Sequence, residues 1–280
     1  MQNVSIRQRL PRDLVWIVGI ACAVNAGMVV ASSGFGYDSH AYWLTGQSGD
    51  IYGRPPNTKD AFLYSPAFAQ ALWPLTQLPW PVFGVIFILA PALTFAWLLR
   101  PLRWQWGVPL WLATLPEIVT GNVFWLLALT AVLGLRHPGA WTVAALTKIT
   151  PCLGPIWFLA RREWRNLGLS VAVIGTVTAV SVALDADAWA DWLAFLSLHM
   201  SQAGDAMGIP VLPPLAIRLP LALAVVVFGA LTGRRQLIPV AMVLSTPVLA
   251  IASFTMLTAM PRLARQANGY QRPPADGGDH

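Results

Sequence analysis

Apolar runs of about 20 residues recur along the whole sequence, and each is long enough to cross a hydrocarbon layer of about 30 Å as a helix. Of the 280 residues, 56% are hydrophobic and only 11% are charged. Soluble domains carry about 25% charged residues, so a water-soluble core does not suit this chain. The sequence therefore predicts an all-α fold, a polytopic transmembrane helical bundle of about 8 to 10 membrane helices.

The positive net charge of +6 does not point to nucleic acid. The basic residues stand in small groups between apolar runs, and no basic face or nucleic-acid motif is present. Membrane topology accounts for this charge better. Cys22 and Cys152 lie inside apolar segments without a partner at metal or redox spacing. We expect no nucleic-acid partner, no metal site and no cofactor.

The N-terminal segment predicts a cytoplasmic start and an outward crossing. Arg7, Arg9 and Arg12 precede an apolar run from Leu14 to about Val30. A cleaved signal peptide is the alternative, but the run is long for one and no clear small-x-small site ends it. We expect an uncleaved first helix and a multi-pass protein of the cell membrane.

Two polar segments, residues 34–80 and 185–215, are predicted to lie outside the cytoplasm, and they hold seven of the twelve acidic residues. In the first, residues 62–80 are apolar and aromatic but interrupted by prolines, which favours an interfacial helix. In the second, AWADWLAFLSLHM has amphipathic helical spacing and predicts a surface helix. We treat residues 1–265 as one transmembrane domain and predict a disordered tail over 266–280.

The remaining apolar stretches are of two kinds. Three are expected to cross the membrane without interruption: Pro81–Leu99, Leu167–Leu184 and Ala216–Thr232. Three others are interrupted: 108–135 at Thr120-Gly121-Asn122, 138–160 at Lys148 and Pro151, and 237–260 at Pro247. If Arg136 is cytoplasmic, each of the first two is a hairpin of short helices with its tip in the outer leaflet, and otherwise each is one broken span. Irregular backbone and a lysine at membrane depth need a polar cavity or burial in protein, so both alternatives put Asn122 and Lys148 beside a site.

Asp38 is the strongest candidate for chemistry, because it stands in GYDSHAYW directly after the first helix. A carboxylate held among aromatic side chains at the membrane surface can act as a general base on a hydroxyl group. A solvated loop aspartate is the alternative.

Several later blocks follow in a recognisable order. After Asp38 come a Tyr52-Gly53 turn, an F-x-Y-x-P signature starting at Phe62, and a closing proline at Pro74. Then come TGNVFWLLAL and AALTKITPCLGPIWFLARREWR, the second holding Lys148 in a lysine-x-x-proline pattern. In this order the blocks resemble glycosyltransferase family 87, membrane enzymes of the GT-C superfamily that use polyprenyl-phosphate sugars. The resemblance covers most of residues 14–165. Gly121-Asn122 stands where the family usually has glycine-glutamine, and the chain is short for a member.

The resemblance implies a GT-C-like bundle and assigns roles to single residues. Asp38 matches the family's catalytic base, and Lys148 matches a family lysine whose ammonium can neutralise a donor phosphate. Arg218, at the start of a later membrane helix, is a second phosphate candidate, with an interfacial anchor as the alternative.

Four further residues are candidates for contacting the sugar or the acceptor: Asn122, Tyr64, Trp43 and His40. Capping of the following helix is the alternative for Asn122. Interfacial anchoring is the alternative for Tyr64 and Trp43. Glu117, in an apolar segment, must be paired, protonated or facing water.

The resulting hypothesis is an inverting hexosyltransferase, a mannosyltransferase of the cell envelope. It would move the sugar from a polyprenyl-phosphate donor to a lipid or glycan acceptor at an extracytoplasmic active site. A transporter or flippase for lipid-linked or small polar substrates is an alternative, since it would use the same broken helices and lysine. A non-catalytic membrane subunit is another.

Overall fold

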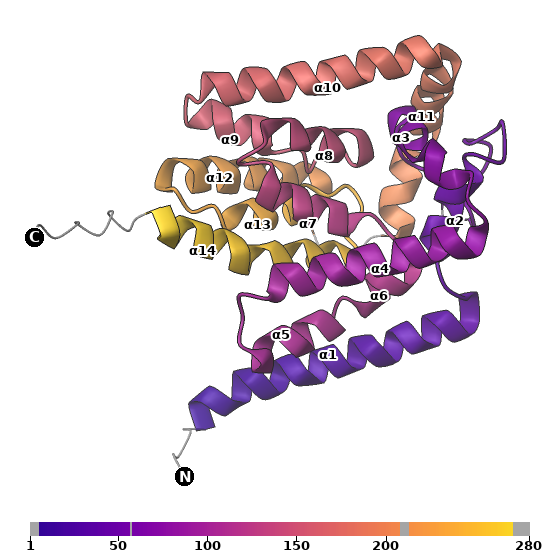
Figure 1. Ribbon diagram of the computed structural model, residues 1–280. Helices are drawn as coiled ribbons and strands as arrows, with labels where there is room; N and C mark the ends of the chain where they lie inside the picture. The colour runs from indigo at the N-terminus through magenta and orange to yellow at the C-terminus, as the bar shows by residue number, and fades with distance from the viewer. Residues whose placement is uncertain (1–5, 57, 208–212, 271–280) are drawn as a thin grey trace, which may run out of the picture.

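The computed structural model describes residues 6–56, 58–207 and 213–270, and within them the fold is entirely helical (Figure 1). This confirms the predicted all-α bundle. The elements, in which η marks a 3₁₀ helix, are α1 (Ile6–Ser33), α2 (Tyr37–Leu44), α3 (Pro66–Thr76), α4 (Trp80–Leu99), α5 (Trp104–Leu112), α6 (Leu115–Thr120), α7 (Phe124–Leu133), η1 (Pro138–Ala140), α8 (Trp141–Thr147), α9 (Gly154–Ala160), α10 (Trp164–Leu184), α11 (Ala186–Met207), α12 (Leu215–Thr232), α13 (Leu237–Ser245), η2 (Ile251–Ala259) and α14 (Met260–Tyr270).

Four helices are long and apolar enough to cross a membrane: α1 from Leu10 onward, α4, α10 and α12. They match the four predicted spans to within a few residues. Many of their apolar side chains face outward, and Leu14, Leu93 and Val171 are each more than half exposed. An apolar surface of this extent is stable in lipid and unfavourable in water.

Each of the three predicted interruptions separates shorter helices (Figure 1). The helix pair α5–α6 runs beside α1 in the same direction, since Gly19 packs on Pro109 while the Gly36 N–H donates to the Val119 carbonyl. At Gly121 the chain reverses into α7. The α8–α9 stretch also reverses, because Leu146 contacts Ser65 near one end of the bundle and Arg161 contacts Ala230 near the other. The structure therefore has the hairpin alternative for both stretches.

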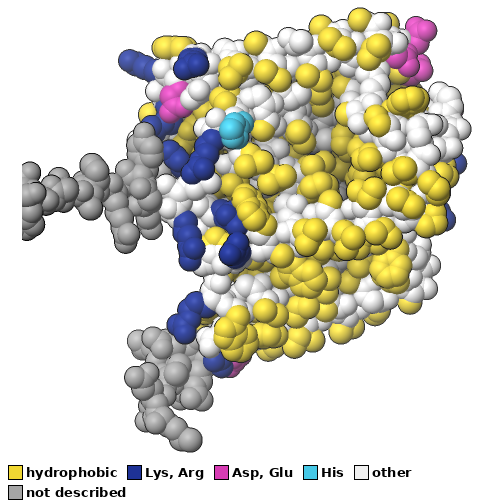
Figure 2. Space-filling model, viewed as in Figure 1, with side chains coloured by type: hydrophobic (Ala, Val, Ile, Leu, Met, Phe, Trp, Pro, Cys, Tyr) yellow, Lys and Arg dark blue, Asp and Glu magenta, His cyan; other side chains and the backbone are white. Residues whose placement is uncertain are grey.

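Basic side chains gather at one end of the bundle. Arg262 and Arg265 donate to the carbonyls of Trp97 and Pro101 where α4 ends, and Arg161 donates to the Ala230 carbonyl near the end of α12. Figure 2 shows Lys and Arg side chains along the edge from which both termini leave. We call this the arginine end, and we call the opposite end, where α1 finishes and α4 begins, the loop end.

The bundle has two hydrophobic cores. The larger core lies between α4, α7, α8, α9, α12, α13 and η2. A smaller aromatic cluster at the loop end consists mainly of Tyr42, Tyr52, Phe62, Tyr64, Phe68, Phe83, Phe87, Trp192 and Phe195. Tyr64 is only 7% exposed, so it is a core residue of this cluster and not a membrane anchor. Burial of these rings holds the first polar segment against the bundle.

Helices occupy both predicted outer segments. α3 lies in the first, and α11 covers the amphipathic stretch of the second. The prediction of a disordered tail from residue 266 is wrong for residues 266–270, because α14 continues to Tyr270. The rest of that tail, residues 271–280, and residues 208–212 of the second segment lie outside the described part of the chain.

Candidate active site

Two short turns at the loop end bring Asp38 and Asn122 together. Asp38 lies in the first turn of α2, and Asn122 directly follows Gly121, which ends α6. The Asn122 amide Nδ2 donates to Asp38 Oδ2 over 3.0 Å, and the Val123 N–H donates to Asn122 Oδ1 over 2.7 Å. Both polar atoms of the Asn122 side chain are therefore used inside the protein. The Val123 N–H precedes α7, so this bond is not the cap of the following helix that the alternative for Asn122 predicts.

Close backbone packing makes this contact possible. Gly121 has φ +70°, and a Cβ atom there would lie 2.5 Å from Ser39 Oγ and 2.7 Å from Ser39 Cβ. Glycine meets both conditions, since it adopts positive φ freely and has no side chain to clash. The Gly36 N–H donates to the Val119 carbonyl over 2.7 Å and joins the same two turns. The α1–α2 turn and the α6–α7 turn thus form one unit that fixes the Asp38 carboxylate.

Glu117 belongs to this unit, although the sequence did not single it out as a site residue. Its side chain is 1% exposed, and its Oε1 accepts the Phe124 N–H over 2.8 Å at the start of α7. Its Oε2 has no hydrogen-bond partner among the described residues. The signal available in the sequence was an acid in an apolar segment four residues before Gly121. That signal shows that a carboxylate needs a partner but not which group supplies it.

Lys148 ends α8 with an extended backbone (φ −137°, ψ 99°), which aims its side chain away from the helix axis. Its Nζ lies 4.0 Å from the centroid of the Phe124 ring and 5.8 Å from that of Tyr64. Among the described residues the ammonium forms no salt bridge. Phe124 therefore links Lys148 to the turn that carries Asn122, and the ammonium is directed into the protein and not toward lipid.

The surroundings of Asp38 favour a basic carboxylate. Burial raises the pKa of Asp38 above the usual aspartate value, while hydrogen bonds from Asn122 and Thr120 and the nearby charge of Lys148 act in the opposite direction. A carboxylate with a raised pKa is a stronger base than a solvated one. These groups partly offset the effect of burial on the pKa of Asp38.

The other residues predicted to contact the sugar or the acceptor have polar contacts with other groups of the protein. His40 Nδ1 lies 2.7 Å from Asp60 Oδ1, and the Trp43 indole N–H donates to the Leu78 carbonyl over 2.9 Å. The hydroxyl groups of Tyr42 and Tyr64 lie 3.2 Å apart. The structure thus groups Tyr64 with Lys148, and it places His40 and Trp43 where they hold the first polar segment.

Arg218 does not join this group. It is 6% exposed and donates to the carbonyls of Pro213, Leu244, Thr246 and Pro247, over 2.7 to 3.1 Å. Four of its five N–H groups are occupied in this way. Three of these carbonyls, those of Leu244, Thr246 and Pro247, lie where α13 ends, and the fourth precedes α12. A phosphate would find one free donor there.

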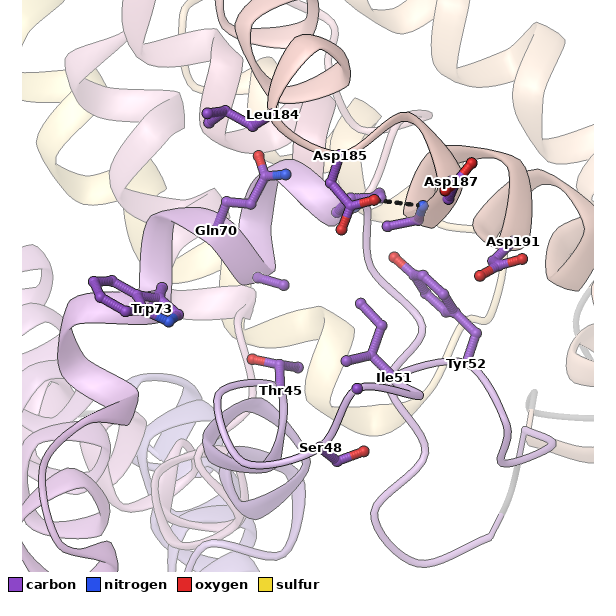
Figure 3. A pocket seen from close by; sticks show the side chains of 14 residues that line it. Thr45, Ser48, Ile51, Tyr52, Gln70, Trp73, Leu184, Asp185, Asp187 and Asp191 are labelled. Atoms are coloured by element: carbon purple, nitrogen blue, oxygen red, sulfur yellow. Dashed lines mark hydrogen bonds between the residues drawn. The ribbon is translucent and has the colours of Figure 1, made fainter.

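A cavity of about 520 Å³ opens at the loop end, next to the Asp38 group and not within it. None of the predicted site residues lines it (Figure 3). In the part of the chain that the structure describes, no cluster of His, Cys, Asp or Glu side chains could hold a metal ion.

Comparison with known families finds one that covers most of the chain. The model of glycosyltransferase family 87 matches residues 62–270. Neither a curated protein nor a solved structure gives a significant match to the chain. The matched range starts after Asp38 and includes Asn122, Lys148 and Arg218.

Proposed function

This chain belongs to glycosyltransferase family 87, a family of membrane glycosyltransferases, and on that premise we propose that it transfers a hexose from a polyprenyl-phosphate donor to a lipid or glycan acceptor. The sugar is mannose, and the active site is the Asp38 group at the loop end, facing away from the cytoplasm. The N-terminus is then cytoplasmic and the protein lies in the cell membrane. Membrane lipids surround it.

The observation that carries this proposal is the 3.0 Å hydrogen bond between Asn122 and Asp38. This bond joins Asp38, which follows the first helix, to Asn122 in the TGNVFWLLAL block, one of the blocks in which the sequence resembles the family. A carboxylate that is oriented by an amide and partly desolvated suits proton abstraction from a hydroxyl group. A structural aspartate would more commonly be paired with a basic residue, and Asp38 has no salt bridge among the described residues.

In the proposed reaction, Asp38 takes the proton of the acceptor hydroxyl as that oxygen forms a bond to the anomeric carbon. The bond from this carbon to the carrier phosphate breaks, and the phosphate leaves with the electron pair. Attack from the opposite face inverts the configuration at the carbon. In this proposal the Lys148 ammonium stabilises the charge that develops on the departing phosphate.

The remaining residues support this arrangement. Asn122 holds Asp38 in place, and the Phe124 and Tyr64 rings hold the Lys148 ammonium through cation–π contacts. In this proposal Arg218 stabilises the interruption after α13, and His40 and Trp43 fix the first polar segment. No cofactor is required, since the carrier phosphate is already a good leaving group.

Transfer of labelled mannose from polyprenyl-phosphate mannose by the purified chain tests the proposal. Wild type should transfer the label, and Asp38→Asn should reduce turnover by at least about 100-fold, as general base catalysis contributes factors of this size. Asp50→Asn, at an exposed carboxylate of the same polar segment, is the matched control and should retain activity. Turnover by Asp38→Asn equal to that of wild type would remove Asp38 from the mechanism.

A further inference from the structure

The cavity at the loop end is assembled from three segments of the chain (Figure 3). Thr45, Ser48 and Tyr52 come from the end of α2 and the loop after it, Gln70 and Trp73 from α3, and three aspartates from the α10–α11 junction. Its volume of about 520 Å³ lies in the range of about 300 to 1,000 Å³ that ligand sites occupy. The cavity is therefore large enough for a small ligand or for part of a larger one.

The lining of the cavity has one sign of charge. Asp185, Asp187 and Asp191 belong to it, and none of its fourteen lining residues is Lys, Arg or His. Asp185 accepts the Ala188 N–H, whereas Asp187 and Asp191 are exposed and take no hydrogen bond from a described residue. Phosphate groups would be repelled here. Hydroxyl groups would be attracted, because a hydrogen bond to a carboxylate is about twice as strong as one between neutral groups.

The cavity also presents an exposed aromatic surface. The side chain of Trp73 is 59% exposed, although the aromatic cluster beside it is almost entirely buried. A flat apolar ring next to carboxylates and an amide suits a ligand with one apolar face and many hydroxyl groups. Sugar rings have this chemistry.

The position along α2 relates the cavity to Asp38. Thr45 follows Asp38 by seven residues, so the two lie on the same face of α2, two turns or about 10 Å apart. Lys148, the proposed phosphate ligand, is not part of the cavity lining. Lys148 and the three aspartates of the cavity therefore belong to different parts of the loop end.

We propose that this cavity binds an uncharged glycan portion of the acceptor, with Trp73 packed on a sugar face and Asp187 and Asp191 accepting hydrogen bonds from its hydroxyl groups. The inference rests on the proposed function and adds the class of acceptor: a glycan with an uncharged part long enough to reach from the cavity to Asp38. The acidic lining repels the donor phosphate from this cavity, and the phosphate binds at Lys148 instead.

Sugar binding by the full chain in lipid nanodiscs tests the inference without requiring turnover. The probes are methyl α-mannoside and mannose 6-phosphate, which differ in charge. We expect the neutral sugar to bind at least about tenfold more tightly. Asp191→Asn should weaken its binding about tenfold, the size of one charge-assisted hydrogen bond, and Trp73→Ala should weaken it by a similar factor because the apolar contact with the sugar face is lost. Trp104→Ala and Asp13→Asn, exposed residues outside the cavity, are matched controls and should bind as wild type does. Equal binding of both probes, or unchanged binding by both cavity variants, would overturn the inference.

A kinetic measurement separates this inference from the proposed function. Asp191→Asn should raise the acceptor KM about tenfold while leaving the donor KM and the slow hydrolysis of donor by water unchanged. If the wild-type chain transfers sugar and the cavity variants have an unaltered acceptor KM, the inference fails and the proposed function stands. If methyl α-mannoside binds as expected and Asp38→Asn transfers sugar like wild type, the proposed catalytic role fails and the cavity assignment stands.

Discussion

Asn122 Nδ2 lies 3.0 Å from Asp38 Oδ2, although 84 residues separate them in the chain. The contact exists because one glycine lets two turns meet and because both turns stand at the same end of the bundle. Orientation of the carboxylate and control of its proton affinity both follow from it.

Replacement of Asn122 should change how activity depends on pH. The Asn122 hydrogen bond lowers the pKa of Asp38 against the raising effect of burial, so Asn122→Ala should raise that pKa further. The reaction needs the deprotonated carboxylate, so activity is present above the pKa and is lost as the pH falls through it. The acid limb of kcat/KM should therefore lie above the pH expected for an ordinary aspartate, and in Asn122→Ala it should move to still higher pH. If the acid limb of kcat/KM does not move in Asn122→Ala, Asn122 does not control the pKa of Asp38.

The Gly121 turn should tolerate no side chain. Gly121→Ala combines a left-handed backbone, which costs about 1–2 kcal/mol, with overpacking against Ser39, which costs about 1–3 kcal/mol. Gly233→Ala is the matched control, because its φ is also positive (+71°) but nothing lies within 4 Å of the added Cβ. Thermal unfolding in detergent should show a larger decrease in apparent Tm for Gly121→Ala than for Gly233→Ala. Equal decreases would mean that Ser39 moves aside freely.

Replacement of Lys148 should reduce donor binding without reducing the stability of the fold. Its ammonium forms no salt bridge within the described residues, and burying a charge without such a partner costs free energy, so an apolar side chain of similar size should not lower stability. We expect Lys148→Met to unfold at the same temperature as wild type or higher, while its donor KM rises at least about tenfold. Lys148→Arg, which keeps the charge, should recover part of the donor affinity. A decrease in Tm that accompanies the lost activity would instead make Lys148 a structural residue.

Arg218 should show the opposite behaviour. Lysine keeps the charge but offers three donors on a single atom, so Arg218→Lys cannot reach the four carbonyls that Arg218 now satisfies. We expect a loss of at least about 3 kcal/mol, seen as a lower apparent Tm, with an unchanged donor KM in the protein that remains folded. A raised donor KM at an unchanged Tm would contradict this and restore the phosphate role.

The sequence determined the membrane character, the four long spans and the positions of the interruptions. Hydrophobicity, length and the residues Gly and Pro act locally, so they can be recognised without knowing what packs against them. It also marked Asp38, Asn122 and Lys148 separately, because polar residues next to broken helices in an apolar chain need a reason to be there.

Only the tertiary structure decided which of these residues act together. The interruptions proved to be reversals of the chain, so they lie at the loop end beside the first polar segment. Close packing of Gly121 against Ser39 brings the Asn122 side chain within hydrogen-bond distance of Asp38. The N–H groups of Arg218 donate to backbone carbonyls, including that of Thr246 just after α13, and not to a phosphate site. Asp185, Asp187 and Asp191 of the second polar segment line a cavity because α11 packs against α3 and the first polar segment. Such partnerships depend on distances between residues far apart in the chain, and no local pattern contains those distances.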